Sequence, residues 1–329
     1  MLFSVVMPVY NARSYIGTAL DSLDAQSFRD FETVIVDDGS TDGTAQLLDA
    51  YAAVHGNVTV IHQQNAGPLL ARRSGVAAAQ GDYILFIDAD DEFVPGAFEV
   101  IRSQIERTHA DVVMFFFARK DGARLLGGAS EIAEGLYNHD GYMKVKECVC
   151  AGQSSNLCSK SIKRTLFDHG DYTPYRGMRH GEDWFQLFPL VDAATSLSVI
   201  PDRLYVYNQG DQSGTASYSR GQLEDIRAVS KRLWTFAEKW GGDCPRAAAR
   251  GELLNYIYLV KISEQSSVSR MQKNANIVEI GEVMREEGAF TRCAQAVLRF
   301  DNRLIVRALE FRCSWLVRFV VSVVEKLKR

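Results

Sequence analysis

The stretch Tyr83-Ile84-Leu85-Phe86-Ile87-Asp88-Ala89-Asp90-Asp91 joins a short apolar run directly to a cluster of acidic side chains. The run lacks polar alternation and is too short for a typical helix, a pattern that indicates a strand buried on both faces. Such strands belong to parallel sheets, in which ligands bind just beyond the carboxyl ends of the strands. The acidic residues stand at that position, so this stretch predicts both a sheet and the place of its site.

The same pattern recurs through the first 120 residues. Short apolar runs rich in β-formers predict strands, and stretches with helical spacing separate them. The strands are expected at Ser4–Val9, Thr33–Val36, Val58–His62, Tyr83–Ile87 and Asp111–Phe117, and the helices at Ser14–Gln26, Thr44–Val54, Leu69–Ala79 and Pro95–Thr108. This alternation predicts an α/β fold with a mostly parallel sheet and helices on both of its faces.

Polar residues follow three of the predicted strands. The first strand ends in Tyr10-Asn11, the second in Asp37-Asp38-Gly39-Ser40 and the fourth in Asp88-Ala89-Asp90-Asp91. The carboxyl ends of parallel strands meet at one edge of the sheet. Three polar strand ends that converge in this way predict a functional site at that edge.

Composition narrows the class of protein. The 329 residues are 47% apolar and 24% charged, a globular balance that excludes a disordered or fibrous chain. The net charge is −4, so we expect no nucleic-acid partner, which would require a strongly basic molecule. Six scattered cysteines argue against a disulfide scaffold, and the apolar N-terminal run lacks the basic region of a signal peptide. A cytoplasmic protein is therefore expected.

The C-terminal part is helical in character, and its end is basic. Residues 303–329 carry seven basic and two acidic side chains, and apolar residues gather on one helical face. The apolar stretch Cys313–Val324 contains Arg318 and is shorter than the ~20 residues needed to span a bilayer. Two interpretations stay open for this basic amphipathic helix. It contacts an anionic membrane surface, at the inner face of the cell membrane, or it packs on the body of the protein.

The acidic cluster of Asp88, Asp90 and Asp91 suits a divalent cation. Neighbouring carboxylates raise each other's pKa unless a positive charge neutralises them. Mg²⁺ and Mn²⁺ take one or two carboxylates together with phosphate oxygens of a substrate. The alternative is a solvated acidic turn in which an aspartate caps the helix that follows.

The other strand ends are compatible with a nucleotide. Asp37 or Asp38 can accept a hydrogen bond from the imide N–H of a nucleobase, and Tyr10 can stack on the base. Arg72 and Arg73 follow Asn65-Ala66-Gly67 and can form charge-assisted bonds to a diphosphate. The alternatives are an ordinary turn with a helix cap after the second strand, and solvated surface arginines.

Together these motifs resemble glycosyltransferase family 2. The resemblance is carried by Val5–Asn11, Val34–Asp42, Asn65-Ala66-Gly67 with Ala71-Arg72, and Phe86–Asp91, in that family's order and spacing. It extends to Ser159–Phe167, Gly181-Glu182-Asp183 and Leu204–Tyr207, and so covers roughly residues 1–215.

The resemblance implies a GT-A fold and a glycosyl transfer. Residues 1–215 are expected to form the glycosyltransferase domain, with a nucleotide-binding half at about 1–120 and an acceptor half at 121–215, followed by a helical region at 216–329. The implied reaction is an inverting transfer, dependent on Mg²⁺ or Mn²⁺, from a nucleotide-diphosphate sugar, usually a UDP-sugar. The transferred group is a hexose or N-acetylhexosamine, and the acceptor is a hydroxyl of a glycan or lipid-linked glycan. Surface polysaccharide or cell-envelope glycan synthesis is the expected setting.

The resemblance also assigns residue roles by position. The residues expected to bind the nucleotide are Pro8, Val9, Tyr10, Asn11, Asp37, Asp38, Arg72 and Asp88, with Arg72 at the phosphates and Asp88 at the ribose. Asp90 and Asp91 are expected to hold the metal. Asp183 matches the general base that takes the proton of the acceptor hydroxyl. The supporting or acceptor-side residues are Glu182, His180 and Lys160. A helix cap at Gly181-Glu182-Asp183 is the structural alternative.

The sequence departs from the family pattern in places, and two other functions compete. Cys158 and Ser159 replace an aromatic residue and an asparagine that are common before Lys160, and no Q-x-x-R-W motif of processive members is present. A non-processive enzyme is therefore favoured. One competing function is a catalytically idle sugar-nucleotide-binding partner of a polysaccharide assembly complex. The other is a nucleotidylyltransferase, which usually has a Gly-rich phosphate loop where this chain has Pro8-Val9-Tyr10-Asn11.

Overall fold

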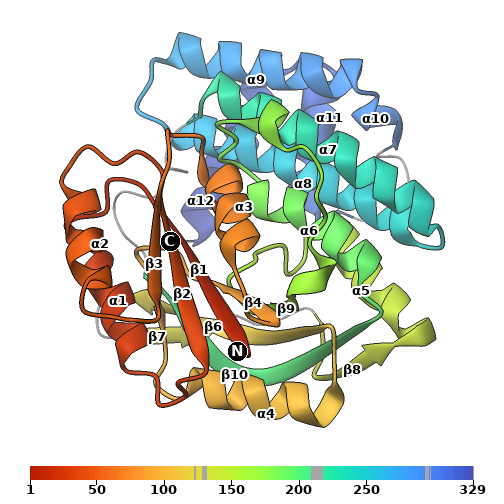
Figure 1. Ribbon diagram of the computed structural model, residues 1–329. Coiled ribbons are helices and arrows are strands. Elements are labelled where there is room, and N and C mark those ends of the chain that lie inside the picture. The colour runs from red at the N-terminus through yellow and green to blue at the C-terminus, as the bar shows by residue number, and fades with distance from the viewer. Residues whose placement is uncertain (122–123, 128–131, 209–217, 293–295, 297, 329) are drawn as a thin grey trace. The chain divides into compact units, whose positions relative to one another are not determined.

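The computed structural model describes residues 1–121, 124–127, 132–208, 218–292, 296 and 298–328. The chain divides into two compact units (Figure 1). The first comprises Met1–Val145 and Ser154–Asp211 and contains the sheet, and the second comprises Lys146–Gln153 and Gln212–Arg329 and is helical. The helix α5 (Tyr142–Cys150) runs from the first unit into the second.

One mixed sheet forms the centre of the first unit. Its neighbouring strands follow the order β3-β2-β1-β4-β9-β6-β10-β5, while β7 pairs with β6 and β8 pairs with β10. The strands are β1 (Phe3–Val9), β2 (Phe31–Asp37), β3 (Val58–His62), β4 (Tyr83–Phe86), β5 (Glu92–Phe93), β6 (Val112–Asp121), β7 (Arg124–Gly127), β8 (Gly135–Asn138), β9 (Lys160–Lys163) and β10 (Ser196–Asn208).

The parallel part of the sheet is the part that the sequence predicts. β1 pairs in parallel with β2 and β4, and β2 pairs in parallel with β3. β6 and β10 are also parallel to each other, but the antiparallel strand β9 separates β6 from β4. The predicted α/β class is confirmed, and the parallel arrangement holds for β1 to β4, while β5, β7, β8 and β9 make the whole sheet mixed. The antiparallel strands β5, β7, β8 and β9 are too short to show a periodicity in the sequence.

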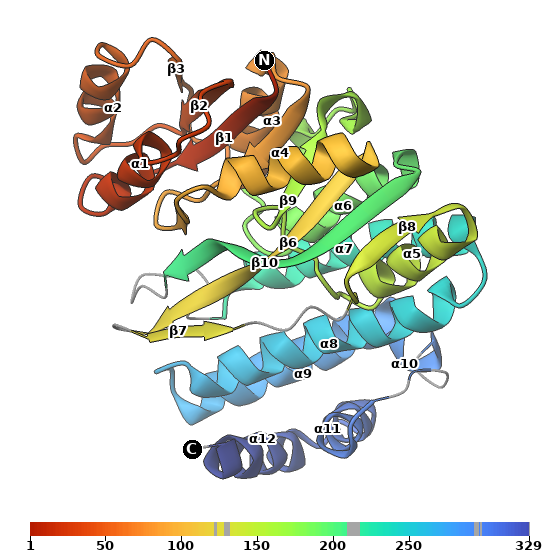
Figure 2. The same ribbon diagram turned by 90° about the horizontal axis from the view of Figure 1, so that it is seen from below.

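Helices cover both faces of this sheet, because successive side chains of a strand point to opposite sides. On one face, Gly75 of α3 (Pro68–Ala78) lies against Val6 of β1, where an added Cβ would come within 2.4 Å of the valine Cγ1. On the other face, Phe98 of α4 (Ala97–Thr108) packs on Phe3 of β1, with ring centroids 5.8 Å apart. Figures 1 and 2 show α3 and α4 on opposite sides of the strands.

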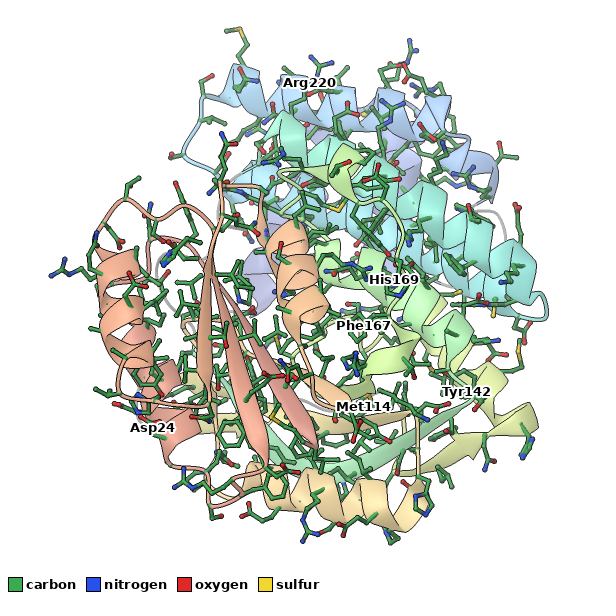
Figure 3. The ribbon with its side chains drawn as sticks, viewed as in Figure 1. Asp24, Met114, Tyr142, Phe167, His169 and Arg220 are labelled. Carbon is green, nitrogen blue, oxygen red and sulfur yellow. The ribbon has the colours of Figure 1, made fainter. Side chains whose placement is uncertain are left out.

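The remaining helices of the first unit are α1 (Ile16–Asp24), α2 (Thr44–Ala52) and α6 (Glu182–Ala193). Side chains fill the spaces between these helices and the sheet (Figure 3). Met114 of β6 and Phe93 of β5 are among the buried ones. Each large apolar side chain buried in this way contributes roughly 1.5–3 kcal/mol to folding.

The second unit consists of the helices α7 (Arg220–Trp240), α8 (Cys244–Gln265), α9 (Arg270–Glu286), α10 (Ala289–Arg292), α11 (Phe300–Glu310) and α12 (Ser314–Lys328). Ser219 begins α7 with a capping box, in which its hydroxyl accepts from the Gln222 amide and its own amide donates to the Gln222 side chain. Buried residues from α7, α8, α9, α11 and α12 form one apolar core. The predicted helical C-terminal region is confirmed.

The C-terminal segment is not one helix, as the sequence suggested, but two. α11 ends at Glu310, Arg312 adopts a positive φ of 56°, and α12 starts at Ser314. A left-handed residue cannot continue an α-helix, so the break shifts the phase of the helical face. Within the ranges described above, no helix combines the length and apolarity that a bilayer crossing requires.

Candidate active site

The carboxyl ends of β1, β2 and β4 lie at one edge of the sheet. Val9 is paired with Asp37 at the ends of β1 and β2, and β4 pairs with β1 on the other side. Tyr10, which follows β1, is 44% exposed, so its ring is accessible to a ligand. Pro8 is half-buried and Val9 is buried within β1 beside it.

Asp38 holds the loop that leads into α3. One of its carboxylate oxygens accepts from the Ala66 amide (2.8 Å) and the Gln63 side-chain amide (2.7 Å), and the other accepts from the Gly67 amide (2.8 Å). The residue is 3% exposed. A carboxylate has about four acceptor positions, so Asp38 keeps capacity for one further donor.

Asp37 and Asn11 lock the neighbouring loops together. The Asp37 carboxylate accepts from the Ser40 amide (3.0 Å) and lies 2.9 Å from the His62 Nδ1. Burial alone would raise the pKa of Asp37, but these hydrogen bonds outweigh burial and hold that pKa below its usual value. Asn11 has a φ of 50°, and its side-chain oxygen accepts from the Thr41 amide (2.8 Å). The β1–α1 and β2–α2 loops are thereby fixed to each other.

Tyr205 of β10 fixes the acidic turn after β4. Its hydroxyl donates to the Asp91 carboxylate (2.7 Å) and accepts from the Asp88 amide (3.1 Å). The other oxygen of Asp91 accepts from the Asn208 amide (2.9 Å). Burial, with Asp88 nearby, raises the pKa of Asp91 to about 8, although the hydrogen bonds from Tyr205 and Asn208 oppose the rise.

Asp88 and Asp90 complete the turn. Asp90 is an exposed residue, but neighbouring atoms of the turn partly shield its carboxyl from water, and this desolvation, together with the charge of Asp88, raises the pKa of Asp90. Among the residues with described placement, no group of three or more His, Cys, Asp or Glu side chains stands ready to hold a metal. A divalent ion that takes one or two carboxylates plus phosphate oxygens needs no such preformed group. The mutual repulsion of these carboxylates fits a cation as an additional partner.

Arg72 connects the acidic turn with the start of α6. It is 3% exposed, and its Nη2 lies 2.8 Å from Asp88 Oδ1. Its Nη1 lies 3.2 Å from Glu182 Oε1 and 2.9 Å from Asp183 Oδ1. Burial would lower the pKa of Arg72, but the three carboxylates raise it well above its usual value. The guanidinium therefore stays charged and joins Asp88 to the adjacent pair Glu182 and Asp183, which is distant from Asp88 in the sequence.

Glu182 and Asp183 occupy the first turn of α6, which Gly181 begins with a positive φ of 73°. Acidic residues are favourable at this end of a helix. Burial and the neighbouring Asp183 raise the pKa of Glu182 to about 7, and burial also raises the pKa of Asp183 against the attraction of Arg72. Asp183 Oδ2 accepts from the Leu157 amide (3.0 Å). A fixed carboxylate with a raised pKa is well suited to accept a proton.

Two further residues expected on the acceptor side, Lys160 and His180, are at least partly buried. The Lys160 ammonium is buried and donates to the carbonyls of Ser154 (2.8 Å) and Asn156 (2.5 Å), and burial lowers its pKa to about 8. It thereby holds the loop whose Leu157 amide reaches Asp183. His180 is half-buried, and burial lowers its pKa.

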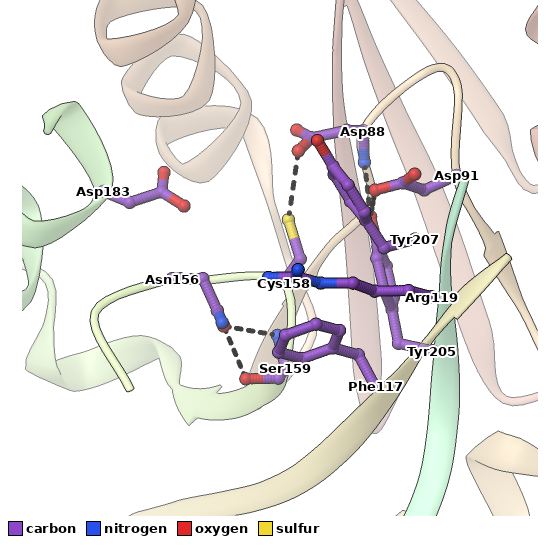
Figure 4. Close-up of a pocket in the computed structure, with 10 residues that line it drawn as sticks. All are labelled: Asp88, Asp91, Phe117, Arg119, Asn156, Cys158, Ser159, Asp183, Tyr205 and Tyr207. Carbon is purple, nitrogen blue, oxygen red and sulfur yellow. Dashed lines mark hydrogen bonds between the residues drawn. The ribbon is translucent and has the colours of Figure 1, made fainter. Parts of the chain in front are cut away.

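A cavity of about 230 Å³ opens between these groups (Figure 4). Asp183 lies on one side of it, while Asp88 and Asp91 lie across from Asp183. The other lining residues are Phe117, Arg119, Asn156, Cys158, Ser159, Tyr205 and Tyr207. Of the sequence-predicted residues, the cavity gathers Asp88, Asp91 and Asp183, and Arg72 and Glu182 contact this group from behind. Tyr10, Asp37 and Asp38 lie at the adjoining strand ends instead, outside the cavity lining.

Several lining residues were not singled out from the sequence. Phe117 and Arg119 come from β6, and Tyr205 and Tyr207 come from β10. The two strands pair in parallel, with Tyr205 opposite Phe117 and Tyr207 opposite Arg119. β6 runs on to Asp121, past the predicted strand end at Phe117, and so brings Arg119 to the site. Tyr205 and Tyr207 lie in the stretch Leu204–Tyr207 that carries part of the resemblance, for which the sequence predicts no role.

The chain is similar to known glycosyltransferases. The family model described as Glycosyl transferase family 2 matches residues 4–161. The putative glycosyltransferase EpsH of Bacillus subtilis (strain 168) is 30% identical over 239 residues, which span 72% of this chain and 69% of EpsH. The glycosyltransferase GlyG of Streptococcus pneumoniae serotype 4 is 35% identical over 114 residues, but this chain spans only 38% of the length of GlyG.

A solved structure matches almost the whole fold. The crystal structure of residues 1–349 of Staphylococcus aureus TarS in complex with UDP-GlcNAc superposes with a TM-score of 0.74. The match covers 99% of this chain and 92% of that chain at 19% identity. TarS is named a poly(ribitol-phosphate) beta-N-acetylglucosaminyltransferase. At this identity the likeness concerns the fold, and it confirms the GT-A fold that the motifs imply.

Proposed function

Because this chain belongs to glycosyltransferase family 2, we propose that it transfers a sugar from a UDP-sugar to a hydroxyl of a glycan or lipid-linked glycan, with inversion. The transferred group is a hexose or an N-acetylhexosamine, and the product belongs to a surface polysaccharide or cell-envelope glycan. The observation that carries the proposal is the cavity with Asp183 on one side and the acidic turn of Asp88 and Asp91 on the other. The UDP-GlcNAc complex of the similarly folded TarS supports the class of donor.

The donor nucleotide is proposed to bind at the ends of β1, β2 and β4. Tyr10 offers an exposed ring for stacking on the base, beside Pro8 and Val9. Asp38 has one acceptor position left for the imide N–H of the base, and Asp37 and Asn11 keep the loops around it in place. Asp88 is assigned to the ribose.

Mg²⁺ or Mn²⁺ is proposed to bind at Asp90 and Asp91. Asp90 is an exposed residue that a metal ion can reach, and each oxygen of Asp91 accepts one hydrogen bond and so retains a lone pair. When bound, the ion would neutralise negative charge on the diphosphate of the donor. Tyr205 and Asn208 hold Asp91 in position for this contact.

Asp183 is proposed as the general base. It would take the proton from the acceptor hydroxyl as that oxygen attacks the anomeric carbon, on the side opposite the departing diphosphate. The Arg72 guanidinium and the Leu157 amide fix its carboxylate. Because Arg72 is buried among carboxylates, we assign it to positioning this base and Asp88 rather than to the phosphate contact expected from the resemblance. Glu182 shares Arg72, Lys160 supports the neighbouring backbone through Ser154 and Asn156, and His180 is assigned to the acceptor side.

The test compares sugar transfer and UDP binding in three variants of the full chain. Asp183→Asn should lower transfer by roughly 100-fold, in line with the loss of a general base, while UDP affinity stays near that of the wild type. Asp90→Ala should weaken UDP binding only when Mg²⁺ or Mn²⁺ is present. Asp202→Asn, at an exposed position of β10, serves as the control and should change neither measurement.

Two results would overturn the assignment. Full transfer activity in both Asp183→Asn and Asp90→Ala would remove these residues from the mechanism. UDP binding by the wild type without turnover on any acceptor would favour the idle nucleotide-sugar-binding function instead.

A further inference from the structure

The second unit exposes large aromatic side chains in one short segment. Among residues of described placement, the exposed phenylalanines and tryptophans all lie in α11, α12 and the turn between them. They are Phe300 (69% exposed), Phe311 (74%), Trp315 (66%) and Phe319 (61%). Every other phenylalanine or tryptophan of the chain is buried or half-buried. Exposed apolar groups gathered in this way mark an interaction surface more often than chance placement does.

α12 is apolar on two sides. Val317, Val320 and Val321 are buried in the core of the second unit and hold the helix in place. Trp315, Phe319 and Val323 recur every four residues and are exposed, so they form one stripe along a different face of the same helix. Packing on the rest of the unit therefore accounts for only part of the apolar surface of α12.

The exposed side of α11 adds positive charge. Arg303 and Arg307 are exposed and stand four residues apart, so they share a face between Phe300 and Phe311. Arg312 in the turn is also exposed. Arg307 Nη1 lies 2.9 Å from Glu310 and Arg312 Nε lies 3.2 Å from Glu282, but both arginines are exposed, and such surface pairs are weak. Arg318 differs, since it is half-buried and its Nε lies 2.8 Å from Glu264. Residues 303–329 carry seven basic against two acidic side chains, so an excess of positive charge remains. The surface that remains combines aromatic rings with arginine.

We propose that α11 and α12 bind the surface of an anionic lipid bilayer. Aromatic rings enter the boundary between headgroups and acyl chains, and arginines attract the phosphates of the lipids. Trp315, Phe319 and Val323 supply the apolar contact, and Arg303 and Arg307 supply the charge. A second copy of this chain fits the surface less well, because the same arginines would face each other across a symmetric contact. In this proposal one face of α12 packs on the core of the second unit, and the other face contacts the membrane.

The experiment measures sedimentation of the full chain with vesicles of phosphatidylcholine alone or with 30% phosphatidylglycerol. The wild type should bind only the anionic vesicles, and binding should fall as salt is raised. The double variant Trp315→Ala/Phe319→Ala should bind about tenfold less, and Arg303→Glu/Arg307→Glu should lose binding by at least as much. Met271→Ala is the matched control, because Met271 is an exposed apolar residue of α9 in the same unit.

Two further measurements separate this proposal from the others. Trp315 fluorescence should shift to the blue when anionic vesicles are added, since its ring leaves water. Donor hydrolysis in the absence of membranes should be unchanged in all these variants. The proposal of membrane binding and the proposal of glycosyl transfer are therefore tested independently. Equal vesicle binding by the wild type and the double variant would overturn the proposal. The proposal would also be overturned if the wild type formed an oligomer and did not bind anionic vesicles, while the double variant was a monomer.

Discussion

A single guanidinium organises the acidic side of the site. Arg72 contacts Asp88, Glu182 and Asp183, residues that belong to the end of β4 and the start of α6. One positive charge is shared by three carboxylates, so each carboxylate depends on the same side chain for its position. The fork of an arginine can hold several oxygens at fixed angles, which a lysine cannot do.

Arg72→Lys should therefore impair catalysis more than donor binding. The charge remains, but the carboxylates lose their fixed orientation, and we expect kcat for transfer to fall by about 100-fold with little change in KM for the donor. Steady-state kinetics on both substrates provide the measurement. Arg73→Lys is the control, because Arg73 contacts Asp168 and the Tyr172 ring away from the cavity. A large rise in donor KM for Arg72→Lys, with kcat preserved, would indicate instead that Arg72 binds the phosphates of the donor.

His62 provides a pH-dependent contribution to stability. Hydrogen bonds to Asp37 (2.9 Å) and Asp49 (3.0 Å) raise the pKa of His62 above its ordinary 6.5. A raised histidine pKa stabilises the folded state below the unfolded value, and this gain is lost as pH rises through the folded value.

His62→Gln should consequently cost more stability at pH 5.5 than at pH 8.5. Because the ring is 44% exposed, we expect a difference of less than about 1 kcal/mol in the free energy of unfolding. Urea unfolding at the two pH values measures it. An equal loss at both values would show that protonated His62 is not the stabilising form.

At the scale of single elements, close packing of α3 on the sheet places Arg72 and the site loop. Gly75 lets this helix approach Val6 and Val36, and a Cβ there would come within 2.4 Å of a Val6 methyl carbon. The approach fixes the height of α3 above the strands, and Arg72 lies one turn earlier on the same helix.

Gly75→Ala should therefore lower the free energy of unfolding by roughly 1–3 kcal/mol through overpacking. Gly17→Ala in α1 is a matched control, because nothing lies within 4 Å of the added Cβ. At that position alanine should stabilise the protein by up to about 1 kcal/mol through its helix propensity. Chemical denaturation of both variants tests the pair, and equal effects of the same sign would contradict this account of α3.

How far the sequence predicts these elements depends on the range of their contacts. The strand ends at Asp38 and Asp88 could be located because each follows a local apolar run. The partnership of Arg72 with Asp183 joins residues more than one hundred positions apart, and no local pattern encodes it. Tyr205 belongs to the stretch Leu204–Tyr207 that carries part of the resemblance, but the sequence predicts no role for it, because its hydrogen bonds to Asp91 and Asp88 also span more than one hundred positions.

At the scale of the whole molecule, each unit contains a buried charged residue that links several of its elements: Arg72 in the first unit and Glu252 in the second. In the second unit, Glu252 is fully buried and lies 2.6 Å from Arg292 Nη2, and it also accepts from the Trp234 indole (3.0 Å). These contacts join α7, α8 and α10. The Arg292 side chain is 31% exposed, so removing Glu252 leaves a partly solvated charge and takes the acceptor away from the Trp234 indole N–H.

Glu252→Ala should therefore destabilise the second unit by about 1.5–3 kcal/mol. Hydrogen exchange should show faster exchange in α7, α8 and α10, with less change in β1, β2 and β4. Glu238→Ala, at an exposed position of α7, is the control and should leave exchange nearly unchanged. Uniform acceleration through both units would contradict the division of the chain into separate cores.

The two-sided character of α12 has a practical consequence for anyone who trims the protein. Val317, Val320 and Val321 are buried in the core of the second unit, whereas Trp315 and Phe319 of the same helix are exposed. A truncation before Ser314 would remove both the buried valines and the exposed aromatic residues of α12. The apolar core of the second unit would then be exposed to water and would promote aggregation. Loss of lipid binding in such a shortened protein would be uninformative, because the protein would also have lost part of its core. Point substitutions of the exposed residues are needed to test lipid binding without destabilising the fold.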